Sequence, residues 1–159
     1  MIINSLAVPD IPLLTSGISK QVEIEAINRT YLASNQLRNA ALKVLSGQRH
    51  GRVYSLPNSR GRKNKKYTAS APGESPAVRL GHLRASWQIR TSFTPGALRE
   101  HRFVASIASR YATQDGRWNI PNLLEGGTGK MEPRPFHQKI LDLALDGIVR
   151  IFKRPYVLK

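Results

Sequence analysis

Cysteine is absent from the sequence, and acidic residues are few. Without cysteine, the chain can form neither a disulfide framework nor a thiolate metal site. Its 159 residues include only 10 Asp and Glu against 25 Lys and Arg, which gives a formal net charge of +15. So basic a balance indicates a polyanionic partner, usually a nucleic acid, or acidic neighbours in an assembly.

Long apolar runs are absent too. No run approaches the roughly 20 residues that a membrane span needs. The first residues, Met1 to Leu14, lack the basic start of a signal peptide and are interrupted by Pro9 and Pro12. We therefore expect a soluble protein that is made in the cytoplasm and has no membrane partner.

The hydrophobic content of 40% provides for one modest core, so we expect a single domain over residues 1–159. Two apolar ends extend from it, an N-terminal arm at residues 1–15 and a C-terminal tail at residues 155–159. The arm either adds to a partner's surface or folds onto its own core as an edge strand, and the sequence favours neither alternative. The tail is a candidate docking strand.

Helical periodicity extends from about Ser16 to Ser46. A helix of roughly 28 residues is a rod about 42 Å long, so we expect one end to pack on a neighbouring subunit. A second amphipathic helix begins near Phe136 and stops before Pro155. The apolar residues of the first helix form two adjacent lanes, Ala26, Ala33, Leu37, Ala40 and Val44 in one and Ile27, Tyr31, Ala41 and Leu45 in the other.

Apolar and polar residues alternate over Trp87–Phe93 and over Arg102–Ser109, which predicts an antiparallel pair of strands. Two strands are only marginally stable alone, so we expect the C-terminal helix to cover the sheet. The predicted fold class is α+β. Long N-terminal and C-terminal helices pack on a small antiparallel sheet, with a long basic loop and extended termini.

The basic loop is predicted over residues 48–71, which are rich in Gly, Pro, Asn and Ser. No acidic residue occurs between Glu25 and Glu74. We interpret this loop as a surface that binds DNA phosphates without sequence specificity or faces an acidic wall. The alternative is a solvated charged loop without a partner. The candidate residues are Arg49, Arg52, Arg60, Arg62, Lys63, Lys65 and Lys66.

Motifs that would indicate catalysis or a cofactor are missing. The histidines occur singly, without metal-site spacing, and there is no Gly-x-Ser-x-Gly elbow or suitable pair of acids. Gly129-Lys130 suggests a phosphate-binding loop, but Leu124 stands where that loop needs Gly and Met131 where it needs Ser or Thr. We expect no enzyme, no cofactor and no metal.

The turn from Leu124 to Phe136 holds three glycines and two prolines, so its geometry is demanding. Pro133 and Pro135 fix φ on both sides of Arg134. We expect this side chain to be presented rather than buried, and the sequence leaves open whether it pairs within its own subunit or with a neighbouring one. Phe136 is expected to be the first core residue of the last helix.

Trp118 lies in a polar stretch before this turn and is either an exposed interface anchor or tucked onto its own core. The candidate interface residues are Leu124, Glu125, Gly126, Gly127, Thr128, Arg134, Pro135, Phe136 and Trp118.

Five segments, taken in order, resemble the tail-component or tail-completion family of tailed bacteriophages, whose members join heads to tails. Members typically show a small-Pro-Gly-Glu-x-Pro-Ala segment, Thr-Gly-x-Leu-Arg-x-Ser at the start of a strand, Tyr-Ala, a Leu-Glu-Phe-Gly-Thr turn and Arg-Pro-Phe before the last helix. This chain departs from the pattern at Leu80, where Thr is usual, and at Gly126, where an aromatic residue is common. The matching segments here are Ser70–Val78, Leu80–Ser86, Tyr111–Ala112, Leu124–Thr128 and Met131–Phe136.

The resemblance implies a structural virion protein that is made in the host cytoplasm. Copies would form a ring, by resemblance a hexamer, in the neck or upper tail. The ring would join the portal-side connector or head-completion protein to the tail terminator or tail tube protein, with genomic DNA in its lumen. The basic loop would then face the lumen. The alternative function is a stand-alone basic nucleic-acid-binding protein.

Overall fold

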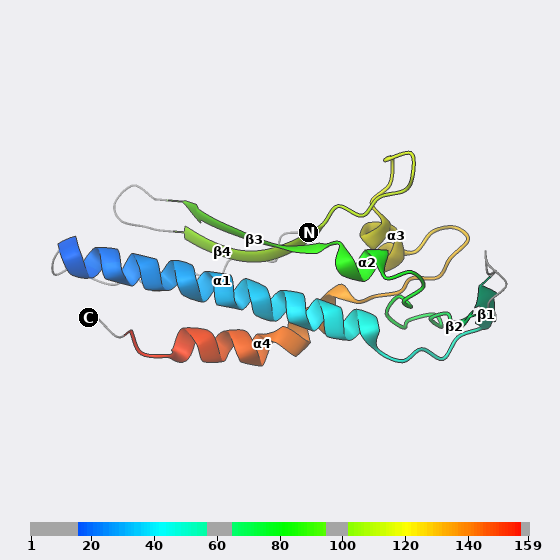
Figure 1. Cartoon of the computed structure of the whole chain (residues 1–159), viewed down its shortest axis with the longest axis horizontal. Helices are drawn as coiled ribbons and strands as arrows, with labels where there is room; N and C mark the ends of the chain where they lie inside the picture. Colours follow the sequence, from blue (N-terminus) through cyan, green and yellow to red (C-terminus); the bar gives the residue numbers. More distant parts are fainter. Residues whose placement is uncertain (1–15, 57–64, 95–101, 157–159) are drawn as a thin grey trace. The chain divides into compact units, whose positions relative to one another are not determined.

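The computed structural model describes residues 16–56, 65–94 and 102–156 (Figure 1). The proposed N-terminal arm, residues 1–15, lies outside the described residues. Contacts group the chain into two compact units, which we describe separately. Unit 1 comprises residues 1–39, 88–108 and 144–159, and unit 2 comprises residues 40–87 and 109–143. In the described ranges, no helix is both long and apolar enough to cross a membrane.

Helix α1 spans Ser16–Ser46, which confirms the predicted helix. Its predicted second lane is wrong at Ile27 and Tyr31, which are 41% and 53% exposed. The buried stripe passes through polar Thr30 and Ser34 instead. Each hydroxyl donates to the carbonyl four residues earlier, at 2.7 and 3.0 Å, so burial leaves neither unsatisfied.

Unit 1 contains most of the strand pair that the sequence predicts. Strands β3 (Trp87–Thr94) and β4 (Arg102–Ser109) form a two-stranded antiparallel sheet, which confirms the prediction. Phe93 stacks on Phe103 with ring centroids 5.1 Å apart. The core of the unit is formed by Ala26, Ala33, Leu37, Phe103, Ile107, Ala144, Ile148 and Ile151.

Helix α4 (His137–Lys153) contributes its last turns to unit 1. Within this unit, Figure 1 draws α1 between the β3–β4 hairpin and α4. Gly147 of α4 faces α1 closely, since a Cβ there would lie 3.2 Å from the Gln36 side chain. In unit 1, α4 therefore packs on α1.

Arg29 joins the end of α4 to α1 within unit 1. Its guanidinium donates to the carbonyl oxygens of Arg154 (2.6 Å), Pro155 (2.9 Å) and Phe152 (3.3 Å). It also lies 3.9 Å from the Tyr156 ring centroid. A cation at a helix C-terminus satisfies carbonyls that have no partner in the helix. The described part of the predicted docking tail thus packs on its own chain.

Unit 2 holds two strands where the sequence predicted a loop. Strands β1 (Val53–Leu56) and β2 (Lys65–Thr68) are antiparallel. Tyr54 pairs with Tyr67, and Val53 pairs with Thr68. The loop prediction for residues 48–71 is therefore wrong in part. Cross-strand aromatic and β-branched pairs stabilise short strands even where charged residues obscure the alternation.

Two short helices complete unit 2. Helix α2 (His82–Ala85) directly precedes β3, and α3 (Ile120–Gly126) was not predicted. The side chain of Asn119 caps α3 by accepting from the Asn122 amide at 3.2 Å, and Pro121 occupies its first turn. The core of the unit is formed by Ala40, Ala41, Leu45, Trp87, Phe136 and Ile140.

Candidate functional site

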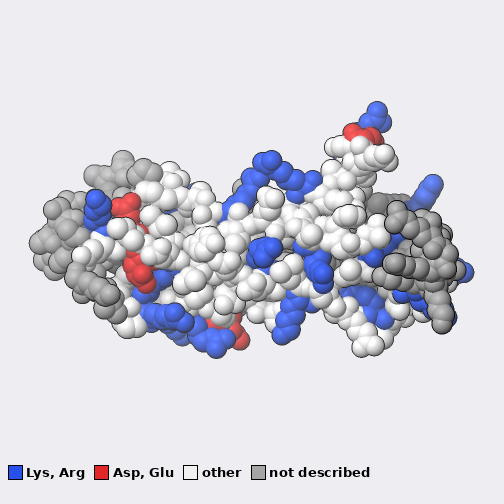
Figure 2. Space-filling view, in the orientation of Figure 1, with Lys and Arg blue, Asp and Glu red and all other residues white. Residues whose placement is uncertain are grey.

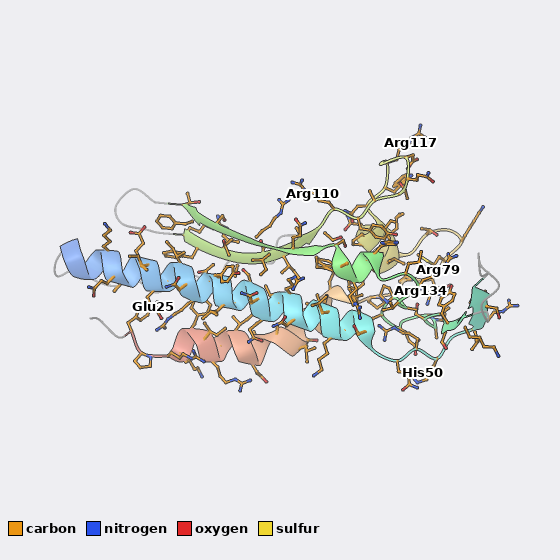
Figure 3. The ribbon with its side chains drawn as sticks, in the orientation of Figure 1. Glu25, His50, Arg79, Arg110, Arg117 and Arg134 are labelled. Atoms are coloured by element: carbon orange, nitrogen blue, oxygen red, sulfur yellow. The ribbon has the colours of Figure 1, made fainter. Side chains whose placement is uncertain are left out.

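The centre of unit 2 is the turn that contains Arg134 (Figure 3). The Arg134 amide donates to the Leu124 carbonyl at 2.8 Å. Its guanidinium donates to the Ser70 hydroxyl at 2.6 Å, to the Ala71 carbonyl at 2.9 Å and to the Ser70 carbonyl. Of the two alternatives that the sequence left open, the structure shows Arg134 pairing within its own chain. The flanking prolines aim it at its own backbone, where its fixed fork of donors holds two remote segments together.

A tight turn over residues 71–74 carries backbone groups that lie against the Arg134 segment. We call the hydrogen-bonded contact between residues 70–74 and residues 133–134 the junction. The Glu74 amide donates to the Ala71 carbonyl at 3.1 Å, and Gly73 between them has φ of 75°. Proline followed by a positive-φ glycine is the pattern of a type II turn. The Gly73 amide donates to the Pro133 carbonyl at 3.1 Å, and Lys139 donates to the Gly73 carbonyl at 3.0 Å. Residues 70–78 and residues 131–136, two of the segments that carry the resemblance, are therefore hydrogen-bonded to each other.

Glu74 is the only acidic residue between Glu25 and Glu100, and it is fully engaged. Its carboxylate accepts from the Ala71 amide at 2.8 Å, the His50 ring Nδ1 at 2.7 Å and the His50 amide at 3.1 Å. The Ala71 amide first, then His50, lowers the pKa of Glu74 from 4.5 to about 2. This surface carboxylate therefore binds its own chain.

Arg49, a candidate for binding DNA, is also used internally. Its guanidinium donates to the carbonyls of Val44 at 2.7 Å, Gln48 at 2.8 Å and Pro76 at 3.1 Å. Burial lowers the pKa of Arg49, and the charge of Glu74 opposes that shift. Arg49 thus connects the end of α1 to the segment that follows the Pro-Gly turn.

The remaining basic candidates fall into two groups. Arg52 and Lys66 are exposed on the β1–β2 pair, and the Arg52 guanidinium lies 5.5 Å from the Tyr54 ring centroid. The backbone of Lys65 belongs to β2, but its side chain lies outside the described residues, as do Arg60, Arg62 and Lys63. Figure 2 shows Lys and Arg at many places on the face in view, and Asp and Glu at few.

Glu125 caps the first turn of α4. Its Oε2 accepts from the amides of Phe136 at 3.0 Å and His137 at 3.2 Å, where the helix dipole favours a carboxylate. Phe136 is fully buried, which confirms it as a core residue, and its ring meets the Trp87 ring edge-on at 6.1 Å. Glu125 and Phe136 therefore hold the fold of unit 2.

His137 follows Phe136 and lies largely buried at the same helix start. Its Nδ1 is 3.4 Å from Glu125 Oε2, while its Nε2 is buried without a hydrogen-bond partner in the described chain. Burial lowers the pKa of His137, and the nearby Glu125 charge acts in the opposite direction.

Among the glycines of the turn, Gly127 has the demanding geometry. Its φ is 73°, and a Cβ there would lie 2.8 Å from the Met131 carbonyl and 2.9 Å from the Pro133 nitrogen. Thr128 and Met131 exchange backbone hydrogen bonds of 2.8 and 3.1 Å across this tight loop. Neither Gly126 nor Gly129 has a positive φ. Further along the turn, the Pro135 carbonyl accepts a hydrogen bond from the Ser75 hydroxyl at 3.4 Å.

Trp118 is exposed, at 59% of its surface, on an ordered loop of unit 2. The Thr113 amide donates to the Trp118 carbonyl, and the Gly116 amide to the Thr113 carbonyl, both at 2.9 Å. The Asp115 carboxylate accepts from the Thr113 hydroxyl and from the Arg117 amide. The loop presents Trp118 and Arg117 to solvent, and Figure 3 marks Arg117 on it.

A pocket of about 520 Å³ opens beside the junction. Its walls are largely apolar and aromatic and include Leu124, and none of its lining residues is acidic. Its characteristic side chains are Tyr54, Tyr67, Tyr111, Arg79, Arg84 and Arg134. Such a pocket suits an apolar segment that carries a negative charge. In the described part of the chain, no group of three or more His, Asp or Glu side chains could hold a metal ion.

The fold and the junction define an α+β chain whose polar contacts serve mainly to join segments. Comparisons with family models, with curated proteins and with solved structures found no match to the chain.

Sequence reasoning missed the roles of Arg49, Glu74 and His50. The signal available was the isolated acid in a basic region, since a lone carboxylate there is surrounded by potential donors. It also missed the pocket, because the residues that line it come from seven separate stretches of unit 2.

Proposed function

We propose that the chain is a structural protein of a tailed-bacteriophage virion. It forms a ring in the neck or upper tail and joins the head connector to the tail around the DNA channel. One observation carries the proposal. The segments that resemble the tail-completion family bind one another in unit 2, through Arg134 to Ser70 and Ala71 and through Gly73 to Pro133. Residues 63 and 64 positions apart in the chain thus form one hydrogen-bonded junction.

The charge distribution supports a polyanionic environment for this ring. Glu74 is occupied by His50 and the Ala71 amide, so the long region between Glu25 and Glu100 offers no free carboxylate. Exposed cations such as Arg52 and Lys66 can bind phosphates of the genomic DNA in the lumen without reading its sequence. Acidic surfaces of the connector or tail proteins would attract them equally.

Exposed apolar groups support contacts with neighbours. Trp118 on its ordered loop is an anchor of the kind enriched at protein interfaces. Leu80, at 67% exposure, lies at the rim of the pocket. A ring of six copies needs two different faces on each subunit, and such separate features meet that requirement.

The proposal is tested by deleting this chain from the phage that encodes it and imaging the lysate. We expect full heads and complete tails that remain unjoined, and a plasmid-borne wild-type copy should restore joined particles. Negative-stain images of particles with a tagged copy should then place the tag at the neck. Normal joining without the chain would overturn the proposal.

A stand-alone nucleic-acid-binding protein is the second candidate, favoured by the net charge of +15. It predicts that the isolated monomer binds DNA tightly and that log K falls steeply with log salt. A monomer that shifts DNA at low micromolar concentration, combined with particles that join normally in its absence, would favour this candidate.

A further inference from the structure

The pocket of unit 2 has an aromatic wall of the kind that accepts proline-containing peptides. Tyr54 and Tyr67 stack with ring centroids 5.6 Å apart, and Tyr111 lies beside His82 with centroids 6.1 Å apart. All four side chains line the pocket. Grooves with aromatic walls bind extended Pro-x-x-Pro segments, because the polyproline conformation is already formed before binding.

The rim of the pocket carries a cation, Arg79, that pairs with none of the described residues. Arg134 is anchored to Ser70 and Ala71, and Arg84 donates to the Ser46 hydroxyl at 2.9 Å. The exposed Arg79 has no hydrogen bond or ion pair to any described residue. Figure 3 marks Arg79 and Arg134, which both line the pocket. An occupant with one carboxylate between apolar groups would complete this rim.

The N-terminal segment of the chain has this composition. Residues 1–19 contain no Lys or Arg, and their one acid is Asp10. Asp10 and Ile11 lie between Pro9 and Pro12, which makes a Pro-x-x-Pro sequence. We propose that the pocket receives Pro9–Pro12 from a second copy of the chain, with Asp10 against Arg79.

The reach of the segment excludes docking in its own pocket. The segment precedes Ser16, the first residue of α1, whereas Leu45 near the last turn of α1 lines the pocket. Those two residues are about 44 Å apart along a helix that rises 1.5 Å per residue. An extended chain of about 3.5 Å per residue carries Pro12 about 14 Å and Pro9 about 25 Å from Ser16. The occupant is therefore another copy.

Such an exchange is a head-to-tail contact, since each copy donates a segment from one end and receives one at a different surface. The inference deepens the proposed function and rests on it where the contact closes a ring. The contact between segment and pocket can be measured separately from that function.

Disulfide trapping tests the contact directly, because the chain has no cysteine of its own. One tagged copy carries Leu13→Cys and a differently tagged copy carries Leu80→Cys, which leaves Asp10 and Arg79 intact. The matched control replaces Leu143, another exposed leucine of unit 2, by cysteine. We expect the mixed-tag dimer to form at least about tenfold faster with the Leu80 variant, because docking raises the local concentration. Equal rates would overturn the proposal.

A charge exchange tests the pairing. Asp10→Arg should slow trapping by about tenfold, and Arg79→Asp in the receiving copy should restore most of the loss. Arg117→Asp, at an exposed arginine of the loop that presents Trp118, is the control and should restore nothing. Restoration by both variants alike would show a general charge effect and overturn the assignment of Arg79.

Two outcomes separate this inference from the proposed function. Trapped dimers from a chain that phage particles do not need would uphold the contact while the proposed function fails. Conversely, a chain that restores joined particles but traps no faster at Leu80 than at Leu143 would overturn the contact alone. A chain with both Leu13→Cys and Leu80→Cys should form no internal disulfide at high dilution, and an internal disulfide would contradict exchange between copies.

Discussion

Two arginines, Arg29 in unit 1 and Arg134 in unit 2, do similar work in different surroundings. Each guanidinium donates to backbone carbonyls of a remote segment, with three such partners for Arg29 and two for Arg134. Arg29 is 2% exposed and is paired with Glu25, whereas Arg134 is half-buried and has no carboxylate partner among the described residues. The comparison shows that a basic composition can serve internal architecture as well as an external polyanion.

Arginines that bind their own chain leave fewer cations free for a partner. Arg29, Arg49 and Arg134 all direct their donors to carbonyls of their own chain. A net charge of +15 therefore overstates the number of cations that a partner can contact. The cations that a partner could still contact are exposed ones such as Arg52, Lys66 and Arg79.

Replacing Arg29 should have the largest effect. Arg29→Ala removes the donors of three carbonyls at the end of α4 and leaves them partly buried, which should cost about 3 kcal/mol of unfolding free energy. Urea unfolding followed by circular dichroism measures the loss. The control is Arg150→Ala, whose exposed side chain donates to the Asp146 carbonyl, and it should change stability by less than about 0.5 kcal/mol. Equal losses of unfolding free energy in the two variants would mean that the buried donors of Arg29 stabilise the protein no more than an exposed arginine does.

Arg134→Ala should cost less, about 1 to 2 kcal/mol, because water can reach the carbonyls that a half-buried fork releases. Amide hydrogen exchange should accelerate at residues 70–74 in particular. From the sequence, this variant is expected to impair assembly more than folding, whereas the contacts predict that unit 2 loosens first. Arg79→Ala, at the same pocket but without a hydrogen bond or ion pair to any described residue, should leave the stability of the single chain unchanged and so provides the control. Unchanged exchange at residues 70–74 in Arg134→Ala would contradict the anchoring role.

Acid should weaken the same junction through Glu74. The folded state keeps the pKa of Glu74 near 2, below its ordinary 4.5, so only the unfolded state takes up a proton between these values. Stability is therefore present above about pH 4.5 and is lost as the pH falls toward 2. Denaturant midpoints at pH 5, 4 and 3 should fall less steeply in Glu74→Gln. Glu132→Gln, an exposed acid of the same unit, should keep the wild-type slope, and identical slopes in all three proteins would contradict the prediction.

The sequence predicted the regular elements well because their apolar periodicity is strong. The bounds of α1 and the pairing of β3 with β4 follow from the spacing of residues such as Ala33, Trp87 and Phe103. It failed at β1, β2 and α3, which are short and rely on one cross-strand pair or one cap, as at Tyr54–Tyr67 and Asn119.

Side-chain roles at the junction were harder to predict. The proline spacing correctly indicated that Arg134 is stiffly held, but it carried no information on direction. That direction depends on where Ser70 lies, and a contact across 64 residues cannot be read from local pattern. Two of the segments that carry the resemblance meet at the junction. From the sequence, however, residues of the second segment were predicted to lie at an interface between subunits.

The smallest effect is expected for Glu25, the acid that pairs with Arg29. Glu25→Gln removes an i,i+4 ion pair of 2.9 Å whose carboxylate is 42% exposed, so it should cost about 0.5 kcal/mol or less. The double variant with Arg29→Ala should lose little beyond Arg29→Ala alone, because Glu25 has then no charge to pair with. The measurement is the coupling energy from urea unfolding of the four proteins in this cycle. A loss in Glu25→Gln as large as that in Arg29→Ala would mean that the ion pair, and not the capture of the α4 carbonyls, holds Arg29 in place, and the likeness to Arg134 would then fail.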